Sequence, residues 1–317
     1  MCIRDSGSIV VSLQESTGAN VTFLSNNFVF YYSSATCTGI VAASCAVGQV
    51  GLTPGATITG TVYGTFDATP VIVAVVSASS FGEFPSVAPG TWMEIYGTNL
   101  ANVTSQTWGS ADFNGNLAPT TLGGNTVTIG GQSAFIDFIS PLQTNALAPS
   151  NTPTGPQPVV VTTPGGTSAP FTVPVNVTEP GLDAPISFYI GGTQYAVAQF
   201  ADGTYVLPTG VIAGLTSRPA QAGDEIVLYG IGFGPVTPSI PAGQLVQQAN
   251  ALASPFGMSI GGTPVANVAY AGSAPGFTGL YQFNVIVPAN PGSGAVPLTF
   301  TVGGVAGTQT LYLAVSN

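Results

Sequence analysis

The chain of 317 residues contains an internal repeat, and this repeat limits its possible folds more than any other feature. Four segments recur in the same order at offsets of 131 to 139 residues: 93–97 with 226–230, 127–131 with 258–262, 143–145 with 282–284, and 161–166 with 299–304. The offset increases after the second match, which indicates an insertion at 271–278 in the second copy. Ordered matches at a nearly constant spacing predict two structural units of the same kind.

Both copies consist of short runs that alternate between apolar and polar residues, separated by Gly, Pro, Asn and Asp; residues 297–302 (PLTFTV) are an example. A period of two predicts strands, and helical periodicity is almost absent. Each copy has about 95 residues, which is the size of an immunoglobulin-like sandwich. We therefore predict an all-β chain of tandem immunoglobulin-like β-sandwiches.

The repeat also divides the chain into domains. We predict a truncated N-terminal β domain at 7–77, a first sandwich at 78–178, and a β-hairpin linker with the second sandwich at 179–317. Within the linker, Asp202-Gly203 separates two strand-like runs. This dipeptide favours a type I′ turn, in which both central residues have positive φ.

Several motifs resemble known domains. Residues 88–100 (APGTWMEIYGTNL) resemble the opening of IPT/TIG immunoglobulin-like domains. Together with LGG at 122–124, SPLQTN at 140–145 and GLYQFN at 279–284, they are similar to the Solibacter-type C-terminal domain over residues 78–317. The polar, Pro-rich segment 146–158 and the low charge depart from that family's pattern. The resemblance implies a large exported acidobacterial protein and supplies no catalytic residue.

Residues 1–6 (MCIRDS) resemble the adaptor-derived leader of reading frames assembled from metagenomic reads. We therefore expect this segment to be non-native, with the original N-terminus lying further upstream.

The charged residues exclude several classes of function. Twelve acidic residues accompany two arginines, with no Lys and no His, for a formal net charge of −10. Nucleic-acid binding needs clustered Lys or Arg, so we expect no nucleic-acid partner. Without His or Lys the chain has no Ser-His-Asp triad, Schiff-base lysine or phosphate loop of the Walker type. No apolar run reaches the length of a membrane-spanning helix, so we expect no membrane insertion.

Catalysis by two carboxylates remains to be considered, because a glycosidase needs only such a pair. The only adjacent acidic pair, Asp224-Glu225, begins a strand, where neighbouring side chains point to opposite faces. We therefore predict that the chain is not an enzyme and that it uses no cofactor.

The polar and aromatic candidates for ligand binding are Trp108 in the loop 105–116 and two Gln-x-Asn pairs, Gln143 with Asn145 and Gln282 with Asn284. Residues two apart on a strand share a face, so each pair forms either a hydrogen-bonding patch for a glycan or peptide, or an internal partner for backbone groups. Trp108 either provides a platform for sugar or covers the edge of the sandwich.

Two further sites have weaker signals. Asp112, Asn114 and Asn116 alternate around Gly115 as calcium ligands do, but no bidentate Glu follows, so an Asx-rich turn is the alternative. Cys37 and Cys45 are predicted to form a disulfide, and two free buried thiols are the alternative.

From these features we expect a non-catalytic extracellular or cell-surface module of a bacterium, serving structure, display or adhesion. The alternative is an accessory carbohydrate-binding module of a larger exported enzyme. Under either function, the expected partners of the chain are polysaccharides or other surface proteins.

Overall fold

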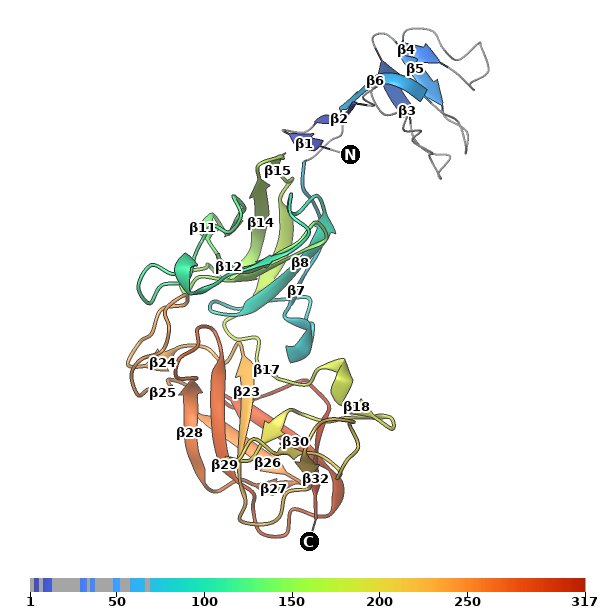
Figure 1. Ribbon diagram of the computed structural model, residues 1–317. Helices are drawn as coiled ribbons and strands as arrows, with labels where there is room; N and C mark the ends of the chain where they lie inside the picture. Colours follow the sequence, from blue (N-terminus) through green and yellow to red (C-terminus); the bar gives the residue numbers. More distant parts are fainter. Residues whose placement is uncertain are drawn as a thin grey trace. The chain divides into compact units, whose positions relative to one another are not determined.

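The structure, a computed structural model, describes residues 69–316 in full and the backbone of six strands before them. Its contacts define two compact units, residues 1–69 with 164–166, and residues 70–163 with 167–317 (Figure 1). The strands of the N-terminal unit are β1 (Ile3–Asp5), β2 (Ser8–Ser12), β3 (Val29–Tyr32), β4 (Ala35–Cys37), β5 (Gly48–Gly51) and β6 (Ile58–Thr65). They pair in the order β1-β2-β6-β3-β5, with β4 also on β6. The predicted Cys37–Cys45 disulfide lies outside the described residues.

The first sandwich of the C-terminal unit has two five-stranded sheets. One has the order β7 (Val71–Ser77), β8 (Trp92–Thr98), β13 (Gln143–Leu147), β12 (Phe135–Ile139), β9 (Gln106–Thr107). The other has the order β11 (Gln132–Ser133), β10 (Thr126–Ile129), β14 (Gly155–Thr163), β15 (Gly166–Thr167), with β16 (Phe171–Val175) also on β14. Fully buried apolar side chains fill the space between them, among them Met93, Ile95, Ile129, Ile136 and Val161.

Strand β7 corrects the predicted boundary between residues 77 and 78. It pairs antiparallel with β8 from Val71↔Thr98 to Ser77↔Met93, so it belongs to the first sandwich and not to the N-terminal domain. The physical reason is its apolar inner face, because Val75 packs into the core of the first sandwich.

The second sandwich has a seven-stranded and a five-stranded sheet. The larger has the order β22 (Ser217–Arg218), β21 (Tyr205–Val206), β20 (Ala198–Gln199), β23 (Glu225–Ile231), β29 (Tyr281–Ile286), β28 (Val268–Ser273), with β17 (Gly181–Leu182) on β23. The smaller has the order β27 (Thr263–Pro264), β26 (Phe256–Ile260), β30 (Gly294–Val302), β31 (Val305–Ala306), with β32 (Leu311–Val315) on β30. Phe233 lies in the core between these two sheets, and its ring centroid is 4.6 Å from that of Phe283 and 5.3 Å from that of Phe300.

Two short ribbons, β18 (Tyr189–Ile190) with β19 (Thr193–Gln194) and β24 (Val236–Thr237) with β25 (Ala251–Leu252), complete the pairing. The described chain also has three 3-10 turns, at Ser79–Phe81, Ser110–Asp112 and Ile186–Phe188, but no α-helix. These features confirm the predicted fold class, an all-β chain with tandem immunoglobulin-like β-sandwiches. Among the described residues, no helix has the length and apolar character needed to cross a membrane.

The hairpin predicted at Asp202-Gly203 exists, but its turn type was wrong. Strands β20 and β21 pair through Gln199↔Tyr205, and only Gly203 has a positive φ, of 81°. The Asp202 carboxylate accepts a hydrogen bond from the Thr204 backbone N–H at 2.9 Å, which stabilises a conformation with negative φ at Asp202. The result is a three-residue loop with glycine in the left-handed position.

The strand register reproduces the repeat at the level of single residues. In the first sandwich, Gln143 pairs with Tyr96 and Asn145 with Glu94. In the second, Gln282 pairs with Tyr229 and Asn284 with Val227.

A bulge recurs as well, because the register shifts between Ile136 and Phe138 in one copy and between Val268 and Tyr270 in the other. The bulged residues are Asp137 and Ala269 respectively, at an offset of 132.

Backbone hydrogen bonds join the two sandwiches within the C-terminal unit. The Ala118 N–H donates to the Gly243 carbonyl at 2.8 Å, and the Leu245 N–H donates to the Asn116 carbonyl at 2.9 Å. The side-chain amides of Asn116 and Gln247 form two reciprocal bonds of 2.9 and 3.0 Å. The facing surfaces of the sandwiches are thereby held in a defined arrangement.

Candidate functional site

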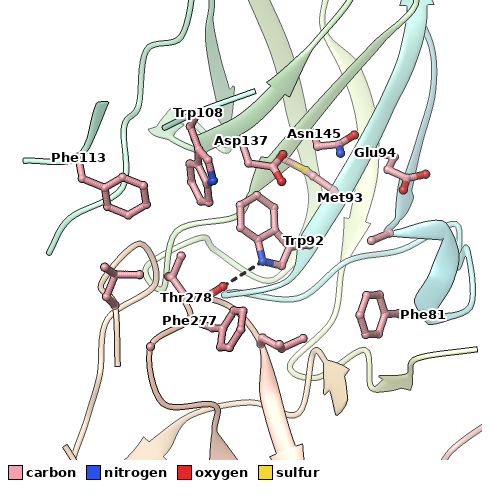
Figure 2. A pocket seen from close by; sticks show the side chains of 14 residues that line it. Phe81, Trp92, Met93, Glu94, Trp108, Phe113, Asp137, Asn145, Phe277 and Thr278 are labelled. Carbon is pink, nitrogen blue, oxygen red and sulfur yellow. Dashed lines mark hydrogen bonds between the residues drawn. The ribbon is translucent and has the colours of Figure 1, made fainter. Parts of the chain in front are cut away.

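Strand β8 presents different residues on its two faces. Met93 and Ile95 are fully buried in the core of the first sandwich, so the alternation of the strand directs Trp92 and Glu94 to the outer face of the sheet. On that face Asn145 of β13 lies beside Glu94, and the bulged Asp137 lies on the next strand, β12 (Figure 2). Glu94, Asn145 and Asp137 therefore form a polar row across three neighbouring strands.

A cavity of about 470 Å³ lies over this row, between the two sandwiches. The first sandwich contributes Ala78, Phe81, Trp92, Met93, Glu94, Trp108, Phe113, Asp137 and Asn145, and the second contributes Leu245, Gly276, Phe277, Thr278 and Leu280. Three of the five residues from the second sandwich belong to the insertion predicted at 271–278. The segment that is extra in the second copy thus closes a site built on the first.

Aromatic rings form much of the cavity wall. The ring centroids of Trp92 and Trp108 lie 5.5 Å apart at an interplanar angle of 76°, and those of Trp108 and Phe113 lie 5.0 Å apart. The indole N–H of Trp92 donates to the backbone carbonyl of Thr278 at 3.1 Å (Figure 2). Phe277 remains 54% exposed at the mouth, although its side chain is apolar.

Glu94 is held in place by two hydroxyl donors. Its side chain is buried and accepts hydrogen bonds from the Ser79 hydroxyl, at 3.0 Å, and from the Tyr96 hydroxyl. Burial, together with the bond to Glu94 and its negative charge, raises the pKa of Tyr96 to about 12. Tyr96 therefore stays protonated and continues to donate to Glu94 throughout the physiological pH range.

The carboxyl of Asp137 is partly buried and poorly compensated. Burial raises its pKa to about 6, and the negative charge of Glu94 contributes in the same direction. A hydrogen bond from Asn145 and one from the Asp137 backbone oppose this effect. Asp137 Oδ1 is buried and has no hydrogen-bond partner within the described part of the chain.

Within residues 69–316, the two carboxyl groups have no basic side chain beside them. The sequence contains only two basic residues, and one of these, Arg4, belongs to the N-terminal unit. The other, Arg218, forms an ion pair of 2.8 Å with Asp224 and lies 3.6 Å above the centroid of the Phe200 ring. The cavity is therefore aromatic and electronegative.

Of the five residues that the sequence indicated as ligand-binding candidates, the structure places two at the cavity. Trp108 and Asn145 line the cavity, whereas Gln143, Gln282 and Asn284 do not. Gln143 Nε2 donates to Asn145 Oδ1 at 2.8 Å, and Gln282 Nε2 donates to Asn284 Oδ1 at the same distance. A bond that recurs in both copies is expected of a structural feature that the duplication has preserved.

In the oxygen-rich loop considered for calcium, two of the three side chains take part in hydrogen bonds within the protein. Asp112 accepts a hydrogen bond from the Gly109 N–H at 2.7 Å, and the Asn116 amide is paired with Gln247. Asn114 lies in a bridge with Leu117. No group of three His, Cys, Asp or Glu side chains suited to a metal occurs in the described residues.

The sequence analysis missed Trp92, Glu94, Asp137 and Phe277 as cavity residues. A comparison of the two copies, position by position, contains the relevant signal. In the strand register, Val227 of the second copy occupies the position that Glu94 has in the first copy. Ala269 is the bulged residue of the second copy, at the position of Asp137 in the first copy. The carboxylates are thus specific to the copy that carries the cavity.

No protein-family model and no curated protein matches this chain. Among solved structures, a gamma-CGTase from Alkalophilic bacillus clarkii aligns over 99% of this chain and 37% of its own, at 10% identity and a TM-score of 0.25. The plexin A4 extracellular region aligns over 78% of this chain and 16% of its own, at 11% identity and a TM-score of 0.24. SGBP-B from a xyloglucan utilization locus in Bacteroides uniformis aligns over 78% of this chain and 49% of its own, at 13% identity and a TM-score of 0.23. The chain thus spans less than half the length of each of these proteins, and at such scores the alignments assign no function to it.

Proposed function

We propose that this protein is a non-catalytic surface module of an exported bacterial protein, and that it binds a glycan in the cavity between its two sandwiches. We also propose that residues 78–317 belong to the Solibacter-type C-terminal domain family that their motifs resemble. The observation that supports glycan binding most strongly is the combination of Trp92, Trp108 and Phe277 with the polar row in one cavity.

The composition of the cavity suits a sugar ring. Its volume of about 470 Å³ lies within the usual range of ligand sites, roughly 300 to 1,000 Å³, and such sites have apolar walls with a few placed polar groups. Aromatic rings offer flat apolar surfaces to the carbon faces of a sugar, while carboxylate and amide oxygens accept hydrogen bonds from its hydroxyls.

The hydrogen bonds of Glu94 favour binding over catalysis. Both of its carboxylate oxygens already accept a bond from a fixed hydroxyl, of Ser79 or of Tyr96. A glycosidase needs one carboxyl group to transfer a proton and a second to act as nucleophile or base. Glu94, with both oxygens engaged, is better suited to positioning a ligand.

A second candidate function is a purely structural surface module. Trp92 favours it, because its hydrogen bond to Thr278 helps to join the two sandwiches. In that case the aromatic residues pack the junction and have no ligand.

Binding measurements with soluble plant and microbial oligosaccharides separate these functions. We expect Phe277→Ala and Trp108→Ala each to weaken binding about tenfold or more, because each removes a stacking surface. Phe277 is half-exposed, so its truncation leaves the fold intact. Tyr189→Ala is the matched control, since Tyr189 is equally exposed, at 54%, but lies outside the cavity.

The absence of binding to every glycan tested would support the structural module and overturn glycan binding. An equal loss of affinity in Tyr189→Ala would show that the ligand binds outside the cavity.

A further inference from the structure

We propose that the glycan bound in this cavity is an amino sugar with a free, protonated amine, so that the site recognises a cationic ligand. This inference depends on the proposed glycan binding and names the chemical class of its ligand. Four observations support it: the charge of the row, the hydrogen-bonding capacity of the row, the aromatic walls, and the difference between the two copies.

The first observation is the uncompensated negative charge. Glu94 and Asp137 flank Asn145 on one face of the sheet, and their charges interact strongly enough to affect the protonation of Asp137. The loop opposite, residues 276–280, consists of Gly, Phe, Thr, Gly and Leu and carries no charge. Paired carboxylates in a partly desolvated site are stabilised by a cation, and the ligand is the component that can supply one.

The second observation is the balance of donors and acceptors. The carboxylates of Glu94 and Asp137 are acceptors only. The Asn145 oxygen already accepts from Gln143, and one N–H of its amide bonds to Asp137, which leaves a single N–H as a donor. The row therefore offers mainly acceptors to a ligand. An ammonium group has three donors and no acceptor, so it complements this row, whereas a hydroxyl leaves its own acceptor sites unpaired.

The third observation is the aromatic wall beside the carboxylates. Trp92 and Trp108 line the same cavity as Glu94 and Asp137, and Phe277 stands at its mouth. A cation above the face of a tryptophan is attracted by the ring quadrupole. The same rings accept the carbon face of a sugar, so one amino-sugar unit satisfies both parts of the wall.

The fourth observation is that the fold does not need the carboxylates. The second copy forms the same strand pairing and the same bulge with Val227 and Ala269 in their places. A buried carboxyl with an unpaired oxygen destabilises a sheet that apolar residues build equally well. The presence of both carboxyls in the copy with the cavity points to a role in binding.

The test compares two ligands that differ mainly in charge, oligomers of glucosamine with free amines and oligomers of N-acetylglucosamine, by calorimetry slightly below neutral pH. We expect the full chain to bind the glucosamine oligomers about tenfold more tightly or better, and this preference to decrease as salt is added. We expect Glu94→Gln and Asp137→Asn each to remove most of the preference while binding of the neutral oligomers persists. Asp183→Asn is the control, because Asp183 is a partly buried carboxyl whose pKa burial likewise raises to about 6, but it lies outside the cavity.

Each outcome decides one of the two proposals. Equal or tighter binding of the N-acetylated oligomers would overturn the cationic ligand and leave glycan binding in place. A preference that survives in both Glu94→Gln and Asp137→Asn, or that Asp183→Asn also abolishes, would likewise refute a role for these two carboxylates. Failure to bind either oligomer or any other glycan would refute the proposed function itself.

Discussion

Asp137 is a residue whose burial makes the stability of the folded protein depend on pH. Its folded-state pKa of about 6 lies above its ordinary value of 3.8, so the folded protein holds this proton more tightly than the unfolded chain does. The contribution of Asp137 to stability is therefore fully present below about pH 4 and is lost as the pH rises through about 6. The groups that face it are Glu94 on β8 and the uncharged amide of Asn145 on β13, while residues 276–280 opposite have no titratable side chain.

We predict that Asp137→Asn stabilises the protein at neutral pH but not at acidic pH. The amide resembles the protonated carboxyl, so both proteins should have similar free energies of unfolding near pH 4. At pH 7 the variant should be more stable by up to about 3 kcal/mol, which corresponds to a shift of about two pKa units. Denaturant titrations at both pH values measure this difference, with the exposed Glu83→Gln as the control for net charge. A constant difference at the two pH values would contradict the prediction.

The site residues also show what the sequence can and cannot reveal. Trp108 and Asn145 were predicted because a loop tryptophan and a same-face amide are visible in a single segment. Glu94 and Asp137 were not, because they lie 43 positions apart and form no pair along the chain. The pairing register of β8, β13 and β12 brings the two residues into one row. The bulge at Asp137 belongs to this row, and no sequence motif marks its position.

At the scale of elements, the insertion 271–278 has the most specific role, because it closes the cavity. The residue that follows it, Gly279, approaches the first sandwich so closely that a Cβ atom there would lie 2.5 Å from Leu147 Cδ1 and 2.7 Å from Trp92 Nε1. Gly279 also has a φ of 69°, which other residues rarely adopt. Glycine is thus required here by both conformation and space.

We predict that Gly279→Ala destabilises the protein by about 1 to 3 kcal/mol more than Gly276→Ala does. Gly276 has a φ of 80° in the same loop, but its Cβ would meet nothing within 4 Å, so the two variants share the backbone strain and differ in crowding. Denaturant unfolding followed by tryptophan fluorescence measures both the stability and the environment of Trp92. Equal losses in the two variants would mean that the loop tolerates displacement from Trp92 and Leu147.

The predicted type of the turn at Asp202-Gly203 and the predicted domain of strand β7 were wrong for physical reasons. The Gly-Gly pairs at 130–131, 261–262 and 303–304 form hairpin turns with positive φ at both positions, as glycine permits. Asp202-Gly203 does not, because the Asp202 side chain bonds to the Thr204 N–H and stabilises a different turn. Strand β7 was assigned to the wrong domain because it precedes the first repeated segment, so the internal alignment had no information on it.

At the scale of the whole molecule, the scarcity of basic residues has a consequence for proteolysis. Trypsin cleaves after Lys or Arg, and this chain has no Lys, Arg4 near its start, and Arg218 followed by Pro219. We predict that trypsin removes the first four residues and leaves the remainder uncut, even in the denatured chain. Intact mass spectrometry after digestion measures this, and chymotrypsin, which cleaves at aromatic residues, serves as the control that the denatured chain is accessible. A tryptic fragment ending within residues 69–316 would contradict the prediction.

The variant Pro219→Ala tests whether the segment 179–218 is part of the second sandwich. It creates a cleavable bond after Arg218, which lies in β22, pairs with Val206 of β21 and contacts Asp224 and Phe200. Cleavage requires an extended and accessible backbone, and β21 and β22 belong to the seven-stranded sheet of the second sandwich. We therefore expect trypsin to cut the denatured variant into two large fragments and to cut the folded variant only slowly. Rapid cleavage of the folded variant would instead mean that the segment behaves as an independent linker, and that the second sandwich begins after Arg218.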